Sequence, residues 1–395
     1  MPKNLLMRAS SPIVAAAFLM ATSAIGPGFL TQTAVFTRQL LASFGFIILI
    51  SILLDIGAQL NIWRIVTMRG KPAQEIVNDL LPGAGHVLTL MITLGGFAFN
   101  TGNLAGAGLG LSALIDLDVK LGALISAAIV ISLFLTGNLL GWLDRFARVL
   151  GFLMIGLTCY VVFVSRPPFG EAIYRSFIPD RVDMTAILTL VGGTVGGYIS
   201  FSGAHRLLDS GMRGVECQPA VQRSAVMAIL LASVMRVLLF LAALGAIYGG
   251  LQPGTDNPAA MVFRHSAGMV GYRIFGLVMW SAAITSVVGS AYTSVSFLRT
   301  LHPILYARQR WVLVIFVLIS LSIFLVVGQP VKILVYAGAL NGFILPFSLG
   351  MLLIAVSRRG FVGRVRHPRW MTAAGWIVVS ATGWMGIRAI LTLIG

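Results

Sequence analysis

The segment ATSAIGPGFLTQT, residues 21–33, interrupts the first long apolar stretch of the chain. Pro27 removes a backbone donor and clashes with the preceding turn of a helix, and the flanking glycines let the chain turn freely. A second interruption, GGTVGG at residues 192–197, lies in a later apolar stretch. Within a bilayer, irregular backbone survives only where it lines a cavity or a ligand. The two segments therefore predict two broken helices that face one site.

The composition of the chain indicates a membrane protein with many spans. Of its 395 residues, 58% are hydrophobic and 10% are charged, whereas a soluble domain carries roughly 25% charged residues. Apolar runs recur between short polar clusters, and each is long enough to cross a hydrocarbon core of ~30 Å as a helix. We predict eleven spans, at about 12–38, 41–63, 86–115, 119–142, 146–165, 185–210, 222–250, 268–298, 309–328, 331–357 and 370–393.

The positions of the two breaks predict how these spans are organised. The breaks lie in the first and sixth spans, which are the first members of two five-helix halves. This order is expected for an inverted-repeat transporter whose site lies at the membrane midplane. We predict one all-α transmembrane domain over residues 1–395, with repeats at about 12–165 and 185–357 and an extra helix at about 370–393.

Basic residues set the predicted orientation. The net charge is +16, and most of the 28 lysines and arginines face inside if the N-terminus is inside. This predicts a bacterial-type plasma (inner) membrane protein with a cytoplasmic N-terminus and an external C-terminus. The basic residues flank the spans and contact anionic lipid there, so the lipid bilayer is an expected partner and nucleic acid is not. A monomer is compatible with the sequence, which leaves the oligomeric state open.

Ionisable residues inside spans or at their ends are few. Asp55, in the second span, is a candidate proton carrier or cation ligand. It is equally a candidate structural partner for a buried arginine, which would be Arg236, Arg388 or Arg38. After the second half of the sixth span come His205, Arg206 and Asp209, which are candidates for an inner gate or a cytoplasmic salt-bridge cluster.

Three stretches of the chain resemble a known family of transporters. SFGFIILISILLDIGAQLNIWRIVTMRGK is similar to the second span of the Nramp family, GNLAGAGLGLSALI to its third, and ALNGFILPFSLGMLL to its tenth. Nramp proteins transport divalent metals and share the LeuT fold with the amino acid–polyamine–organocation superfamily. The resemblance runs over nearly the whole chain, and it implies a LeuT-like fold with helices 1 and 6 unwound at mid-membrane.

The metal ligands of that family have no counterpart here. The first-span Asp-Pro-Gly-Asn corresponds to Gly26–Phe29, and the sixth-span Met-Pro-His corresponds to Gly196–Tyr198. The third-span Asp and Glu associated with proton movement fall on Asn100 and Asn103, and a tenth-span Gln falls near Gly338. A dehydrated divalent ion needs anionic ligands, and soft metals select sulfur. We therefore expect the fold without a transition-metal site, and glycines that leave extra room or exposed backbone at the breaks.

The chemistry that remains at the breaks suits a small anion. Broken helices offer free N–H groups at a half-helix N-terminus, although nearby hydroxyls often only re-bond helix carbonyls. We predict an ion-coupled secondary transporter for bicarbonate or a short carboxylate such as 5-oxoproline or an amino acid. The alternative is a divalent cation transporter of the parent type for hydrated Mg²⁺. The candidate substrate-binding residues are Gly26, Pro27, Gly28, Phe29, Gln32, Asn100, Asn103, Gly196, Gly197, Tyr198 and Ser200.

The eighth span suggests a coupling ion. Ala282, Thr285 and Ser286 resemble the Ala-x-x-Thr-Ser pattern of the sodium site in LeuT-like carriers, where they join carbonyls of the broken first span near Ser23. Oxygen ligands suit a hard cation. Na⁺ or H⁺ is therefore the expected coupling ion. We expect no other cofactor and no enzymatic activity, because the chain has no nucleotide-binding loop and no catalytic triad.

Overall fold

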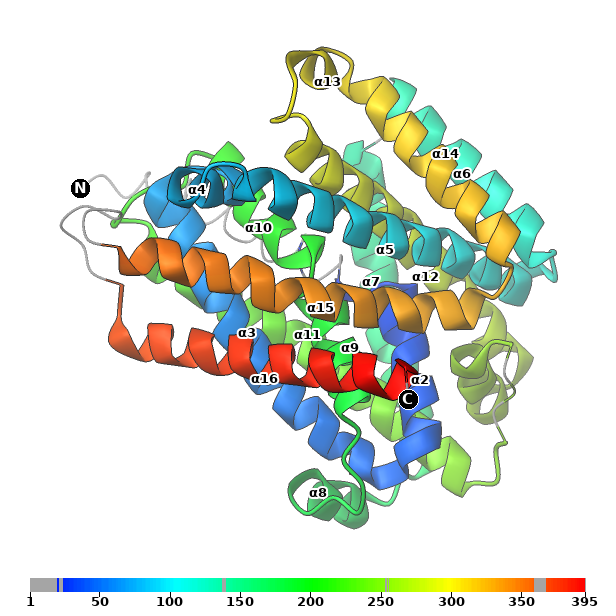
Figure 1. The fold of residues 1–395 in the computed structure, drawn as a ribbon. Helices are drawn as coiled ribbons and strands as arrows, with labels where there is room; N and C mark the ends of the chain where they lie inside the picture. The colour runs from blue at the N-terminus through cyan, green and yellow to red at the C-terminus, as the bar shows by residue number, and fades with distance from the viewer. Residues whose placement is uncertain are drawn as a thin grey trace, which may run out of the picture.

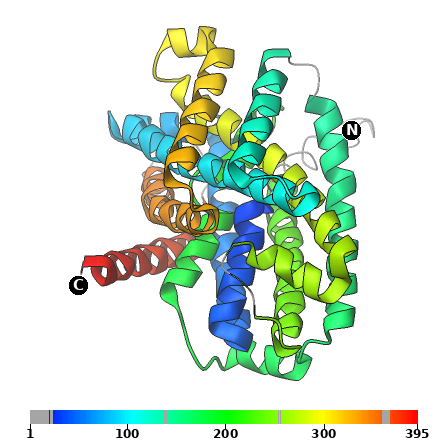
Figure 2. The same cartoon turned by 90° about the vertical axis from the view of Figure 1, so that its right-hand side faces the viewer.

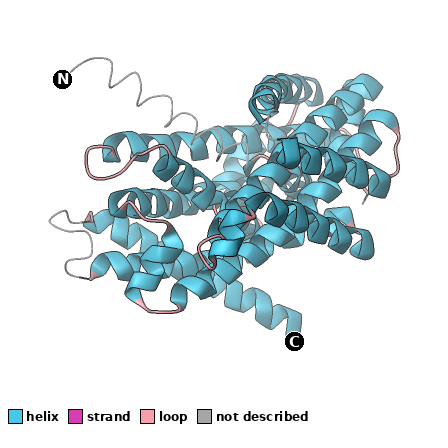
Figure 3. Cartoon of the chain, turned by 90° about the horizontal axis from the view of Figure 1, so that it is seen from above, coloured by secondary structure: helices cyan, strands magenta, loops and turns pink. Residues whose placement is uncertain are grey.

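The computed structural model describes residues 20, 24–136, 140–252, 254, 256–358 and 367–394, which form helices and loops without strands (Figures 1 and 3). Nine helical segments in these ranges are long and apolar enough to cross a membrane, or ten if the bent pair at residues 149–177 is one span. The all-α fold class is confirmed. The count of eleven spans stays a prediction, because residues 12–19 and 21–23 of the first predicted span lie outside the described residues. The orientation of the termini also stays a prediction, because no observation tests it.

The described helices follow the predicted spans in order, with short helices added between them. Three short helices, α4, α8 and α13, were not predicted, because the prediction considered only apolar runs long enough to cross a membrane, and these helices lie in the connections between them. The elements are α2 (Pro27–Leu40), η1 (Leu41–Ser43), α3 (Phe44–Arg69), α4 (Ala73–Leu80), α5 (Ala84–Ile115), α6 (Val119–Thr136), α7 (Leu140–Ser165), α8 (Phe169–Phe177), α9 (Met184–Thr194), α10 (Tyr198–Asp209), α11 (Gln218–Tyr248), α12 (Pro258–Leu298), α13 (Pro303–Ala307), α14 (Gln309–Val327), α15 (Pro330–Ser357) and α16 (Arg369–Ile394).

Both predicted breaks are present. Ala24 is helical, Ile25 and Gly26 form a bend, and α2 starts at Pro27, where proline is pre-organised for a helix start. The sixth span is divided into α9 and α10 by residues 195–197. Gly197 has a φ of 52°, which lies in the left-handed region that favours glycine.

The start of the eighth span differs from the prediction. The sequence predicts a span from residue 268, but α12 begins ten residues earlier at Pro258. Its helical path is interrupted at Gly268, where φ is 63° and ψ is −161°. The segment before Gly268 is therefore a helix that joins the span at a kink, and the predicted boundary coincides with that kink.

Close helix crossings bring the breaks together. A Cβ atom at Gly110 of α5 would lie 2.6 Å from the backbone nitrogen of Trp280 in α12, so these two helices touch through their backbones. On the other side, Gly192 of α9 lies against the Gly338 carbonyl of α15. The last helix, α16, packs outside this core against α15 and α3 (Figure 2).

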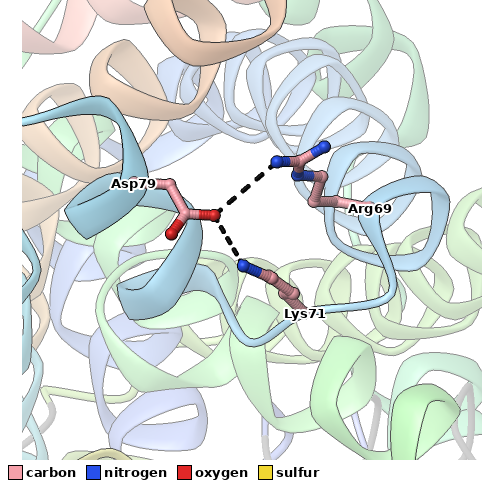
Figure 4. A network of polar contacts seen from close by, with 3 residues as sticks. All are labelled: Arg69, Lys71 and Asp79. Carbon is pink, nitrogen blue, oxygen red and sulfur yellow. Dashed lines mark hydrogen bonds and ion pairs between the residues drawn. The ribbon is translucent and has the colours of Figure 1, made fainter. Parts of the chain in front are cut away.

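A polar contact outside the membrane holds the loop after α3. The Asp79 carboxylate of α4 lies 2.7 Å from Lys71 Nζ and 3.6 Å from Arg69 Nη2 (Figure 4). The hydrogen bond from Lys71 is the main cause of a lowered pKa of Asp79. The α3–α4 connection thus carries partly exposed ion pairs, which contribute little to stability, whereas the helices of the core beneath it touch through their backbones.

Candidate functional site

The two breaks converge on Asn103 of α5. A Cβ atom at Gly26 would lie 3.4 Å from Asn103 Oδ1 and 2.8 Å from Ser286 Oγ of α12. Tyr198, the first residue after the second break, directs its hydroxyl toward the Asn103 side chain. Four residues predicted from the sequence, Gly26, Asn103, Tyr198 and Ser286, are therefore neighbours.

Polar atoms at this junction lack partners. Among the described residues, Asn103 Nδ2, the Tyr198 hydroxyl and the Ser286 hydroxyl make no hydrogen bond of ordinary geometry. Their side chains are almost wholly shielded from solvent, with exposures of 2%, 0% and 1%. Native proteins pair nearly all buried polar groups, so unpaired ones mark strain or a ligand. This cluster of donors is the strongest indication of a ligand site between the breaks.

The main chain adds further donors. α2 and α10 both start directly after a break, with Gly26 and Gly197 as N-cap residues that supply no side-chain hydrogen bond. The first N–H groups of a helix have no partner inside the helix, and the helix dipole makes this end positive. Both starts therefore favour a negatively charged or carbonyl-bearing ligand.

The extra room expected at the glycines is filled. Gln32 of α2 donates its Nε2 to the Leu334 carbonyl at 3.0 Å. A Cβ atom at Gly338 would lie 2.5 Å from that nitrogen, and one at Gly193 would lie 2.7 Å from Gln32 Oε1. Of the two alternatives expected from the glycines, extra room or exposed backbone, extra room is not found at Gly338, because the Gln32 side chain from the first span occupies the space.

Asn341 of α15 fills the corresponding place at the second break. Its Nδ2 donates to the carbonyls of Gly95 at 3.0 Å and Ala337 at 2.9 Å. Its Oδ1 lies against Gly197 and has no hydrogen-bond partner. Sequence reasoning missed this residue, although a single amide inside the apolar stretch ALNGFILPF was a visible signal.

A buried arginine lies against both breaks. Arg236 of α11 is 2% exposed and donates its Nη1 to the Thr194 hydroxyl at 3.0 Å. Its guanidinium carbon lies 4.1 Å from the centroid of the Phe29 ring, an attractive cation–π arrangement. Thr194 ends α9 at the second break, and Phe29 follows the first break. Arg236 Nε and Nη2 have no partner in the described part of the chain.

Asp55 belongs to the same cluster. Its side chain is 1% exposed, and its carboxyl approaches Thr194 and faces the positive charge of Arg236. The ion pairs among the described residues do not include a direct Asp55–Arg236 contact, and Asp55 Oδ1 has no partner. Of the three arginines considered from the sequence, Arg236 is the one that faces Asp55.

Asn100 lies in a separate polar cluster. It donates its Nδ2 to Ser320 Oγ of α14 at 3.1 Å and accepts a hydrogen bond from Ser290 of α12 at 2.9 Å. Its side chain is buried and both of its polar atoms are paired. The structure therefore places Asn100 in a packing role between α5, α12 and α14, against the prediction that it binds substrate.

The hydroxyls of two predicted site residues donate hydrogen bonds to nearby main-chain carbonyls. Ser200 donates to the Val195 carbonyl at 2.8 Å, which satisfies the end of α9. Thr285 donates to the carbonyls of Ala282 at 3.0 Å and Ser281 at 3.2 Å. Of the predicted sodium-site residues, only the Ser286 hydroxyl is unpaired and faces a break, and Ser23 lies outside the described residues.

The predicted gate residues do not gather into a salt-bridge cluster. His205 is buried, lies 3.2 Å from Ser296 Oγ through Nδ1, and stacks on Phe297 with ring centroids 4.8 Å apart. Arg206 and Asp209 are exposed and take part in none of the ion pairs of the described residues. Both side chains lie at the surface while His205 is buried, and a gating role for the three stays a prediction.

The described part of the chain does not bring together groups that would hold a metal ion. Within the described ranges, no three His, Cys, Asp or Glu side chains lie close enough to bind one. Both cysteines, Cys159 and Cys217, are free. The donors at the junction are instead amides, hydroxyls, main-chain N–H groups and one guanidinium.

Comparison with known proteins places this architecture in a family. Residues 17–392 match the family described as natural resistance-associated macrophage protein-like, or Nramp. The uncharacterised membrane protein YcsG of Bacillus subtilis (strain 168) is 53% identical over 382 residues, which span 97% of this chain and 95% of that protein.

Solved structures show the same fold at low identity. A manganese transporter of Eremococcus coleocola, crystallised with an aromatic bis-isothiourea compound, superposes with a TM-score of 0.77 at 17% identity, over 99% of this chain and 88% of that one. The structure of MhsT in complex with L-phenylalanine superposes with a TM-score of 0.65 at 15% identity, over 97% of each chain.

Proposed function

Because the chain belongs to the Nramp family, whose members are membrane transporters and not enzymes, we propose that it is an ion-coupled secondary transporter of a small anion. The substrate binds between the first and sixth helices at the breaks, where α2 and α10 begin. Bicarbonate and short carboxylates, including 5-oxoproline and amino acids, have the size and charge that this chemistry recognises. Transport proceeds by alternating access around this site.

One observation carries the proposal. The unpaired atoms of Asn103, Tyr198 and Ser286 at the junction of the breaks are one amide donor and two hydroxyls. The unpaired acceptors near the breaks, Gln32 Oε1 and Asn341 Oδ1, belong to side chains that fill the space beside the glycines. The nearest buried cation described is the guanidinium of Arg236, which lies against Thr194 and Phe29. A divalent cation placed there would meet a like charge without a carboxylate or sulfur at the family's ligand positions. An anion would meet two helix N-termini, amide and hydroxyl donors, and a charge-assisted hydrogen bond.

The fold does not fix the sign of the substrate charge. The Eremococcus coleocola protein is a manganese transporter, and MhsT was crystallised with L-phenylalanine, which carries a carboxylate and an ammonium group. Family membership favours a second candidate, a divalent cation transporter that accepts hydrated Mg²⁺. In that case Asp55, the buried carboxylate nearest the breaks, would have to serve the ion. Its position opposite Arg236 weakens this alternative.

Uptake into proteoliposomes separates the two candidates. Purified protein is reconstituted, and labelled bicarbonate, 5-oxoproline and an amino acid are supplied in turn under gradients of H⁺ or Na⁺. Entry of Mn²⁺ and Mg²⁺ is followed with an internal metal-sensitive dye. We expect one of the anions to accumulate and neither metal to enter. Metal entry without accumulation of any anion would establish the cation transporter instead.

A matched pair of variants tests the site itself. Gly26→Asp restores an acid at the family's first-span ligand position, and Gly26→Asn introduces a side chain of the same size without charge. Both push against Ser286 Oγ, which can rotate away. We expect Gly26→Asp to reduce anion uptake well below Gly26→Asn, because a carboxylate repels the substrate. Equal uptake by the two variants would place the anion elsewhere.

A further inference from the structure

The cluster of Asp55, Thr194 and Arg236 contains one cation and one potential anion in the interior of the protein. Both charged side chains are buried, at 1% and 2% exposure. They come from different helices, α3 and α11, and meet at Thr194 of α9. Among the described residues, Arg236 is the charged side chain that faces Asp55 from the surrounding helices.

Asp55 and Arg236 make no direct hydrogen bond to each other among the described residues. Arg236 donates a hydrogen bond from Nη1 to Thr194, and its Nε and Nη2 are unpaired. Asp55 Oδ1 is also unpaired. A buried ion pair is normally closed by direct hydrogen bonds, because its desolvation is otherwise poorly compensated. Here the guanidinium lies over the Phe29 ring, and its Nε and Nη2 remain available to hydrogen-bond a second anion.

We propose that Arg236 is shared between Asp55 and the substrate anion, and that each anion is carried together with one proton bound to Asp55. This inference rests on the proposed function. A single guanidinium in a poorly hydrated interior compensates one negative charge, and two like charges close to it shift one of them to its neutral form. When the substrate anion binds Arg236, Asp55 takes a proton from the water on the open side. When the anion leaves on the other side, that proton leaves as well.

The charge balance of this cycle is distinctive. Without substrate, Asp55 is ionised and the cluster is neutral. With a monovalent anion bound, Asp55 is protonated and the cluster is again neutral. Both crossing steps are therefore electroneutral, so a pH gradient drives accumulation and the membrane potential does not. By linkage, the affinity for the anion rises as the pH falls.

Labelled 5-oxoproline is a suitable probe, since an α-carboxylate stays ionised above about pH 5. Proteoliposomes are prepared with an inside of about pH 8 and an outside of about pH 6, without Na⁺. With one proton per monoanion, accumulation should approach tenfold for each pH unit of gradient. A potential imposed with K⁺ and valinomycin at equal pH should drive none. If 5-oxoproline is not carried, another short monocarboxylate is tested in the same way, because the charge balance of the cycle requires a substrate with one net negative charge.

Asp55→Asn isolates the proton step, because asparagine resembles the protonated carboxyl group in size and lacks charge. This variant should still exchange labelled for unlabelled anion at equal pH, and it should lose accumulation driven by the pH gradient. Exchange also verifies that the variant is folded. Glu75→Gln, at an exposed position of α4, removes a carboxylate far from the cluster and should accumulate the anion like the unchanged protein.

The outcomes are separable. If no anion of the panel enters the unchanged protein, the proposed function fails and the coupling fails with it. If an anion enters but accumulation follows Na⁺ or the membrane potential, only the coupling is overturned. If Asp55→Asn still accumulates anion against a pH gradient, Asp55 is not the proton site. Exchange without accumulation in Asp55→Asn, with normal accumulation in Glu75→Gln, supports the proposal.

Discussion

Two polar clusters lie in the interior of this protein, and they differ in both charge and completeness. Asn100, Ser290 and Ser320 form a neutral cluster in which both polar ends of the amide are hydrogen-bonded. Asp55 and Arg236 form a charged cluster in which three side-chain atoms have no partner. Buried polar groups cost free energy unless they are paired. The neutral cluster has its amide hydrogen-bonded and therefore stabilises the packing of the helices. The charged cluster still has hydrogen-bonding capacity for a ligand.

The comparison also shows where charge lies in this chain. The resemblance to Nramp proteins implies that acids of the third span move protons, and the matching positions here are Asn100 and Asn103. The interior carboxylate lies instead on α3, opposite an arginine on α11. If the two clusters have the roles assigned to them, changes in the charged cluster should alter transport, and changes in the neutral cluster should alter stability.

Removal of the guanidinium should have the largest effect. A hydrogen bond to a charged group contributes about 1.5–3 kcal/mol, so Arg236→Gln should lower the affinity for the anion by about 100-fold. Anion uptake over a range of concentrations measures this loss. The neutral-cluster control, Ser320→Ala, should retain the affinity of the unchanged protein.

Arg236→Gln also leaves Asp55 buried without its counter-charge, which on its own destabilises a protein by about 3–5 kcal/mol. The double variant Asp55→Asn with Arg236→Gln removes both charges and should recover the thermal stability lost in the single variant, without recovering anion uptake. Normal uptake by the double variant would contradict the role of Arg236 in binding.

The second break should be sensitive to any added side chain. Gly197 has a φ of 52° and lies against Asn341 Oδ1, so Gly197→Ala combines backbone strain with a steric clash. Gly211→Ala is the matched control, because its φ is 77° and open space surrounds it. Strain alone costs about 1–2 kcal/mol.

We expect Gly197→Ala to lower the melting temperature in detergent well beyond Gly211→Ala, and to abolish uptake. Adding Asn341→Ala to Gly197→Ala removes the side chain that clashes with the new methyl group, and it should recover part of the lost stability. A melting temperature equal to that of Gly211→Ala would mean that the second break is not packed as described.

Two asparagines on one helix sharpen the comparison. Asn100 has paired polar atoms, and Asn103, one turn further along α5, has an unpaired Nδ2 at the junction of the breaks. Asn103→Ala should reduce the affinity for the anion about fivefold, since one hydrogen bond contributes about 1 kcal/mol. Asn100→Ala should leave affinity unchanged and lower the melting temperature. If Asn100→Ala lowered the affinity and Asn103→Ala lowered only the melting temperature, Asn100 would be the binding residue and Asn103 the structural one.

The fold and the two breaks could be predicted from the sequence because their physical causes are local. Proline and clustered glycine interrupt a helix wherever they occur within an apolar span, as at Pro27 and Gly197. Hydropathy likewise located most helices, although the polar residues of α4 and α8 left no such signal.

The composition of the site was less predictable, because it depends on which distant side chains meet. Nothing in the sequence separates Asn100 from Asn103, yet one is paired by α14 and the other faces the breaks. The sequence also did not show that Gln32 and Asn341 fill the space beside the glycines. Arg236 was visible as a charge inside a span, but its contact with both breaks required the packing of α11 against α2 and α3.

The smallest expected effect concerns a neutral contact at a helix end. His367 Nε2 lies 2.8 Å from Asn61 Oδ1, and Asn61 Nδ2 donates to the Met371 carbonyl at 2.9 Å, which ties the start of α16 to α3. Burial, and then the nearby charge of Arg64, lowers the pKa of His367 to about 4. The folded state therefore binds this proton more weakly than the unfolded state, whose pKa is about 6.5.

By linkage, the stability that His367 contributes is fully present above about pH 6.5 and is lost as the pH falls from there toward 4. The melting temperature of the unchanged protein should fall by a few degrees over this window, at about 1 °C per kcal/mol for a chain of this length. His367→Gln, which stays neutral, should remove that part of the pH dependence and leave anion affinity at neutral pH unchanged. An acid-induced loss of stability that persists in His367→Gln would assign the effect to another group, and the tie between α16 and α3 would then be insensitive to protonation.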